Sequence, residues 1–131
     1  MARVLVVEDN SANLKLISLL LNNSGHSVLA AADAEAGLTM ASVELPDLIL
    51  MDIQLPGMDG LTATALLKEG HITAAIPIIA LTAMAMKADR ERSMEAGCDA
   101  YITKPVRYQE LYAAIDAVLQ DASADAETEA T

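Results

Sequence analysis

Short apolar runs alternate five times with longer segments in which apolar residues recur at helical spacing, and this alternation constrains the fold more than any other feature of the chain. The apolar runs predict strands at 3–7, 27–31, 48–51, 77–81 and 100–103. The periodic segments predict helices at 13–23, 33–44, 61–69, 85–96 and 108–119. Because the run at 48–51 contains no polar residue, it is typical of a strand that is covered on both faces.

Strands that alternate with helices predict a parallel sheet with helices on both faces, joined by right-handed crossovers. We therefore expect the α/β class: a single (βα)5 unit, doubly wound, with the flavodoxin-like strand order 2-1-3-4-5. Apolar residues make up 53% of the 131, which is enough for one core but leaves no room for a second folded unit. The expected domain covers residues 1–120, and the acidic tail 121–131 is predicted to be disordered because it lacks apolar periodicity.

Charge and cysteine content narrow the function classes. The net charge is −11, which argues against nucleic-acid binding, since that binding needs clustered Lys and Arg side chains. A single cysteine, Cys98, cannot form an internal disulfide, and this fits a reducing compartment. The sequence shows no signal peptide and no clean apolar segment of membrane-spanning length. We expect a soluble cytoplasmic protein.

Polar residues that could take part in catalysis or metal binding follow four of the five predicted strands. They are Glu8 and Asp9, Asp52, Thr82, and Lys104. A parallel sheet brings such positions together in the crevice beyond the carboxyl ends of its strands. Three carboxylates gathered there repel one another unless a cation binds between them.

Mg²⁺ suits this set of ligands, since it prefers oxygen donors and retains water that a phosphate can replace. Asp9 and Asp52 are expected to bind it directly, Gln54 through its backbone carbonyl, and Glu8 through water. Lys104 and the hydroxyl of Thr82 would then meet phosphoryl oxygens. These parts predict phosphoryl transfer to a carboxylate nucleophile, with an aspartyl phosphate formed on Asp52.

Four separated motifs carry a resemblance to a known family. They are VVEDN (6–10), LILMDIQLPGMDG (48–60), IIALTAMAMKADRE (78–91) and GCDAYITKPV (97–106). Over roughly residues 3–119 the chain resembles the receiver domain of bacterial two-component response regulators, the CheY-like superfamily. The phrases MDIQLP and ALTAMAMK are similar to those of single-domain cell-division regulators of the DivK type.

The resemblance implies roles for individual residues. It implies that Asp52 accepts the phosphoryl group from a phosphohistidine, and that Glu8 and Asp9 form the acidic pair at the metal. Thr82 and Tyr101 are the implied switch pair: Thr82 moves towards the phosphoryl group and Tyr101 rotates inward. Lys104 is implied to contact the phosphoryl group, and the bond between Lys104 and Pro105 is expected to be cis.

Two further expectations concern tuning and specificity. Met84 stands two residues after Thr82, where rapidly dephosphorylating receivers often carry an acidic or amide side chain. Our hypothesis is that Met84 slows self-dephosphorylation. Specificity for the kinase is expected on the first helix, including Asn13, Leu14 and Ile17.

The expected function is a phosphorylation-controlled switch of protein–protein interactions, and the only catalysis expected is of its own phosphorylation and dephosphorylation. The expected partners are a sensor histidine kinase or histidine phosphotransfer protein and a downstream protein effector, with no nucleic acid and no membrane. The protein is expected to be a monomer or weak dimer. Two alternatives stay open: a receiver-like scaffold that is never phosphorylated, and a phosphatase of the haloacid-dehalogenase type. Such phosphatases usually have a second Asp two residues after the nucleophile, a position that Gln54 occupies in this chain.

Overall fold

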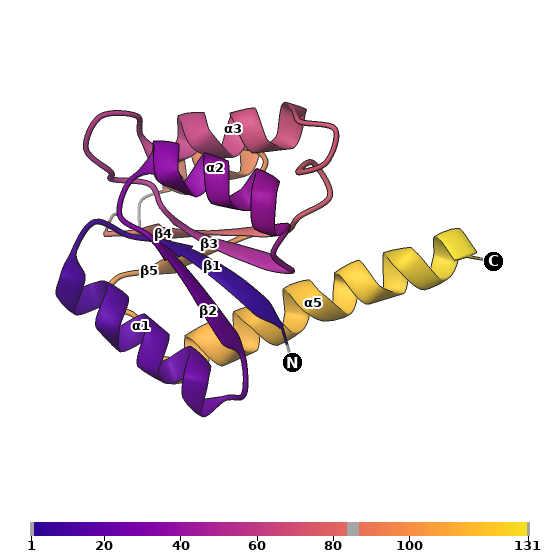
Figure 1. Cartoon of the computed structure of the whole chain (residues 1–131), viewed down its shortest axis with the longest axis horizontal. Helices are drawn as coiled ribbons and strands as arrows, with labels where there is room; N and C mark the ends of the chain where they lie inside the picture. Colours follow the sequence, from indigo (N-terminus) through magenta and orange to yellow (C-terminus); the bar gives the residue numbers. More distant parts are fainter. Residues whose placement is uncertain (1, 84–86, 131) are drawn as a thin grey trace.

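We describe the protein from a computed structural model that covers residues 2–83 and 87–130, with 121–130 described by their backbone alone. Strands and helices alternate along the whole chain (Figure 1). Their bounds are β1 (Arg3–Val7), α1 (Ser11–Asn23), β2 (Ser27–Ala31), α2 (Ala34–Glu44), β3 (Leu48–Asp52), α3 (Gly60–Glu69), β4 (Ile78–Thr82), α4 (Lys87–Ala96), β5 (Ala100–Thr103) and α5 (Tyr108–Ala130).

The five strands form one parallel sheet in the order β2-β1-β3-β4-β5, which confirms the predicted α/β fold and its strand order. β1 lies next to β3, so their carboxyl ends are neighbours although 44 residues separate Glu8 from Asp52 along the chain. This adjacency explains how distant sequence positions can form one site.

Two cores lie on opposite faces of the sheet. Helices α2 and α3 cover one face and α1 and α5 the other (Figure 1). On the first face Val7, Met51 and Ala80 pack against residues of α2 and α3. On the second face Val6, Leu50 and Leu81 pack against residues of α1 and α5. Alternate residues of each strand thus enter different cores, which is the pattern expected of strands buried on both sides.

Capping residues explain where the helices begin. α1 begins at Ser11 rather than 13, because the side chain of Asn10 accepts a hydrogen bond from the backbone N–H of Asn13. In α3 the cap is Asp59, which accepts from the N–H of Thr62, so the helix includes Gly60. The sequence prediction placed both helix starts one or two residues late because it followed apolar spacing alone.

Helix α5 continues to Ala130, through the acidic segment in which the sequence pattern indicates no regular structure. The domain boundary near residue 120 and the disorder of 121–131 stay predictions. Among the helices that the structure describes, none combines the length and apolar character needed to cross a bilayer.

Candidate functional site

The carboxyl ends of β1 and β3 place two acidic side chains next to each other inside the protein. Glu8 directly follows β1, and Asp52 is the last residue of β3. Their exposed fractions are 1% and 2%, so both carboxylates are almost completely removed from water. Two adjacent carboxylates without a compensating charge would be costly at this depth.

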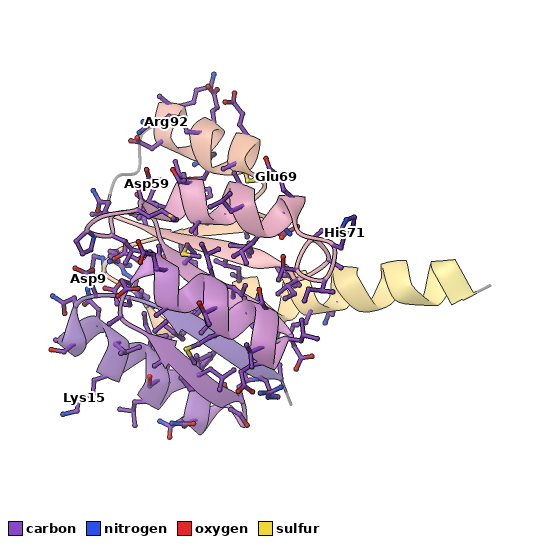
Figure 2. All side chains as sticks on the ribbon, turned by 45° about the horizontal axis from the view of Figure 1, so that its top comes forward. Asp9, Lys15, Asp59, Glu69, His71 and Arg92 are labelled. Atoms are coloured by element: carbon purple, nitrogen blue, oxygen red, sulfur yellow. The ribbon has the colours of Figure 1, made fainter. Side chains whose placement is uncertain are left out.

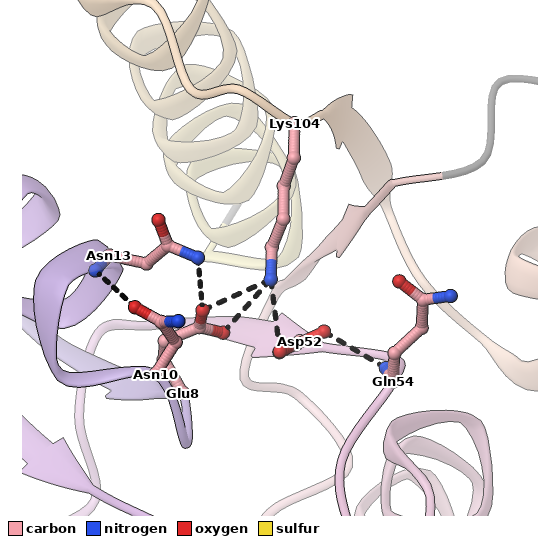
Figure 3. A network of polar contacts seen from close by, with 6 residues as sticks. All are labelled: Glu8, Asn10, Asn13, Asp52, Gln54 and Lys104. Atoms are coloured by element: carbon pink, nitrogen blue, oxygen red, sulfur yellow. Dashed lines mark hydrogen bonds and ion pairs between the residues drawn. The ribbon is translucent and has the colours of Figure 1, made fainter.

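Lys104 supplies that compensating charge from the loop after β5 (Figure 3). Its Nζ lies 3.0 Å from Oε1 and 3.2 Å from Oε2 of Glu8, and 3.0 Å from Oδ2 of Asp52. The Lys104 side chain is 17% exposed, so the ion pairs are largely shielded from solvent. Removing one partner of a buried ion pair leaves an unpaired charge, which makes this lysine a structural as well as a chemical part of the site.

Asp9 adds a third carboxylate to the cluster. Carboxylate oxygens of Glu8, Asp9 and Asp52 all lie within 4.8 Å of one another. Asp9 is exposed, and Figure 2 shows it at the end of the molecule where the strands finish, whereas His71 lies at the opposite end. Three carboxylates against one lysine leave negative charge in excess. A set of oxygen donors with excess negative charge fits a hard divalent cation such as Mg²⁺.

The two buried acids differ in pKa. Burial first, and then contact with the Asp52 carboxylate, raise the pKa of Glu8 to about 7 in spite of the opposing effect of Asn13 and Lys104. Burial also acts to raise the pKa of Asp52. Hydrogen bonds from Glu8, the backbone N–H of Gln54 and Lys104 outweigh that effect and hold it below its ordinary value. Asp52 is therefore ionised at neutral pH, while Glu8 retains a proton for part of the time.

The first turn of α1 orients Glu8. The side-chain amide of Asn13 donates a hydrogen bond of 2.9 Å to Oε1 of Glu8. Sequence reasoning placed Asn13, Leu14 and Ile17 on a kinase-facing surface, but Ile17 is fully buried in the core beneath α1 and cannot contact a partner. The helical spacing that marked Ile17 was the signature of its burial.

The loop between β3 and α3 orients Asp52. The backbone N–H of Gln54 donates to Oδ1 of Asp52 at 2.9 Å, so the two oxygens of this carboxylate have different partners. At the far end of the loop, α3 comes so close to β3 that a Cβ on Gly60 would lie 2.2 Å from the carbonyl oxygen of Asp52. Only glycine fits there. Sequence reasoning missed this contact, whose one signal is the Asp59–Gly60 pair.

Thr82 and Tyr101 lie on one face of neighbouring strands. The register pairs Thr82 with Thr103 and Ala80 with Tyr101, and residues two apart along a strand share a face. The two candidate switch residues are thus diagonal neighbours. Thr82 is buried at 2% exposure, whereas Tyr101 is half-buried.

The turn after β5 contains the predicted cis peptide bond between Lys104 and Pro105. Met84, the proposed determinant of phosphate lifetime, lies outside the described residues.

Comparison with known proteins gives a consistent result. The sequence pattern of the response regulator receiver domain matches residues 4–116. Over 119 residues the chain is 44% identical to the polar-differentiation response regulator DivK of Brucella anthropi, covering 91% of this chain and 97% of that protein. DivK of Brucella abortus shows the same identity and coverage.

Solved structures agree with the sequence comparison. A response regulator from Chloroflexus aurantiacus superposes with a TM-score of 0.88 at 31% identity, over 91% of this chain and 98% of that one. The receiver domain of the sensor histidine kinase PA1611 from Pseudomonas aeruginosa superposes with a TM-score of 0.85 at 35% identity, with the same coverage. That structure holds a magnesium ion in its active site cleft.

Proposed function

The chain belongs to the response regulator receiver domain family, and from this membership we propose that it is a DivK-like phosphorelay receiver whose phosphoryl acceptor is Asp52. In this proposal it takes the phosphoryl group from a phosphohistidine on a sensor kinase or phosphotransfer protein in the cytoplasm, and passes the signal on by changing its protein contacts. The observation that carries the proposal is the ion-paired cluster in which Lys104 bridges Glu8 and an ionised Asp52, with Asp9 beside them.

The donor set supports a magnesium site. Asp9 and Asp52 would hold the ion directly, Gln54 would add its backbone carbonyl, and Glu8 would act through a bound water. Such an ion neutralises charge on the phosphoryl oxygens and on the attacking carboxylate. Glu8, with its pKa raised to about 7, would give up its proton to solvent as the cation takes its place beside the cluster.

The chemical step forms one bond and breaks one. An oxygen of Asp52 attacks phosphorus, the P–N bond to the donor histidine breaks, and the electron pair returns to the imidazole nitrogen. Asp52 is suited to this because its lowered pKa keeps it ionised and because Gln54 and Lys104 fix its orientation. Lys104 would turn from the acids to the phosphoryl oxygens. Its Nζ can reach them because it already contacts the carboxylate of Asp52, to which the phosphoryl group would be attached.

Buried as it is, Asp52 is surrounded at its carboxylate by polar groups. Lys104, Gln54 and the neighbouring acids lie against it, and Asp9 is exposed at the edge of the cluster. Small movements of Lys104 would therefore be enough to admit a phosphoryl donor. Thr82 would then donate its hydroxyl hydrogen to a phosphoryl oxygen, and Tyr101 would move inward on the same face of the sheet. The surface formed by α4, β5 and α5 would change with it.

Labelling with a small acyl phosphate separates this function from its two alternatives. Wild type and Asp52→Asn are incubated with acetyl phosphate or, separately, with a phosphate ester, with and without Mg²⁺, and labelled protein and released phosphate are measured. The proposal predicts one Mg²⁺-dependent phosphoryl group per wild-type chain and none on Asp52→Asn. Continuous turnover of phosphate esters would support a phosphatase instead. A wild-type chain that takes up no label would support a scaffold.

A further inference from the structure

A cation from α4 covers the ring of Tyr101. The guanidinium carbon of Arg90 lies 4.7 Å from the centroid of that ring. A guanidinium within about 6 Å of an aromatic face is attracted to it by the ring's quadrupole, and Arg adds planar stacking that Lys lacks. Tyr101 is half-buried and packs against the core on one side, while Arg90 is exposed, so the contact lies at the protein surface.

The other basic residues described on α4 are engaged along the helix. Lys87 lies 3.9 Å from Glu91, and Arg92 pairs with Asp89. Arg90 instead reaches across to β5. Its position over the ring is therefore a specific link between α4 and the strand that carries Tyr101.

The ring of Tyr101 borders a surface hollow of about 430 Å³ that is also lined by other residues of β5 and by α5. Its register partner on β4 is Ala80, which has a small side chain, and Thr82 lies two residues further along that strand. Tyr101 also packs against the core cluster on this face of the sheet. The contact with Arg90 is the interaction that an inward rotation towards Thr82 would break.

We propose that Arg90 is a positioning residue: it holds the ring of Tyr101 in its half-buried resting position and so sets how rarely the unphosphorylated protein visits the switched state. This inference rests on the proposed function, because it takes Tyr101 as a moving part. An exposed cation–π contact changes a two-state equilibrium by about two- to fivefold. A ligand that binds only the state with Tyr101 turned inward gains the same factor in apparent affinity when the contact between Arg90 and Tyr101, here called the latch, is removed.

The experiment uses the full chain with fluorotyrosine and beryllium fluoride, a stand-in for the phosphoryl group, in the presence of Mg²⁺. The ¹⁹F signal of Tyr101 is identified as the one that Tyr101→Phe removes. Its shift is followed as beryllium fluoride is added to wild type, Arg90→Gln and Arg90→Lys. Lys87→Gln is the matched control, because it removes one cation from the same helix at a side chain that is 88% exposed.

We expect Arg90→Gln to move the resting signal towards the beryllium fluoride position and to tighten the apparent affinity about two- to fivefold. Arg90→Lys, which keeps a cation, should fall between that variant and wild type, and Lys87→Gln should match wild type. If wild type responds and Arg90→Gln behaves identically to it, the latch is refuted while the proposed function stands. If the wild-type signal does not respond to beryllium fluoride at all, the proposed function and the latch both fail.

Discussion

Replacing Lys104 by Met tests whether this lysine and Mg²⁺ share one set of acids. The variant keeps most of the length of the side chain but leaves two buried carboxylates without their positive partner. Losing the charge-assisted bond to Asp52 costs about 1.5–3 kcal/mol. Glu8 can escape most of its penalty by taking up a proton, because its pKa is already about 7, so at pH 7.5 it adds less than about 1 kcal/mol. Without Mg²⁺ we expect the free energy of unfolding to fall by about 3 kcal/mol in total.

Saturating Mg²⁺ should restore most of that loss. An ion that binds only the folded cluster stabilises it by about 2.7 kcal/mol at a concentration a hundred times its dissociation constant. The variant should bind Mg²⁺ more tightly than wild type, because no lysine competes for the acids. Urea unfolding in EDTA and in Mg²⁺ measures both effects. In thermal unfolding, the midpoint temperature should shift by about 3 to 5 °C for each kcal/mol.

Lys68→Met is the control for this experiment. Lys68 is a similarly shielded lysine that donates to the carbonyl of Ile76 and pairs with Asp99, at the other end of the sheet. Its replacement should destabilise the protein equally with and without Mg²⁺. A Lys104→Met deficit that is also independent of Mg²⁺ would refute the idea that lysine and metal share one set of acids.

Three further predictions address the rest of the site. Gly60→Ala forces a backbone shift beside Asp52 and should cost about 1–3 kcal/mol and slow phosphorylation. The control Gly57→Ala places a Cβ in open space but at a left-handed φ of 75°, so it should lower stability by about 1 kcal/mol and leave phosphorylation unchanged. Asn13→Ala removes the bond that orients Glu8 and should weaken Mg²⁺ binding several-fold by calorimetry; unchanged affinity would remove Asn13 from the site. Without Mg²⁺, the raised pKa of Glu8 means that the folded state binds its proton more tightly than the unfolded state. Stability should therefore fall as pH rises from about 4.5 to about 7, and a level urea-midpoint profile over that window would contradict it.

The residues that meet at the strand ends were predictable from the sequence, because a parallel sheet brings the carboxyl ends of neighbouring strands together. Once β1 and β3 are neighbours in a parallel sheet, Glu8 and Asp52 must lie together, and the sequence alone supplies both acids. The same rule brought Lys104 to the cluster. What it did not predict is that Lys104 pairs with both acids, since periodicity says nothing about where a long side chain ends.

Contacts that helices make with loops and strands could not be predicted from the sequence. The approach of Gly60 to the backbone of Asp52 depends on the angle at which α3 leaves its loop, and no spacing rule encodes that angle. Asn13 was read as part of an outward surface because its side chain was judged from its helix alone, yet it turns back to Glu8. The position of Arg90 over Tyr101 likewise requires the distance between α4 and β5.

The central claim is that one carboxylate among three neighbours receives the phosphoryl group. Borohydride reduces an acyl phosphate to an alcohol, so it converts a phosphorylated aspartate to homoserine in place, and peptide mass spectrometry then locates it. After treatment with acetyl phosphate and Mg²⁺, we predict homoserine at position 52 and unaltered residues at Glu8 and Asp9. Reduction at either of those positions, or at 52 to the same extent in EDTA, would contradict the account.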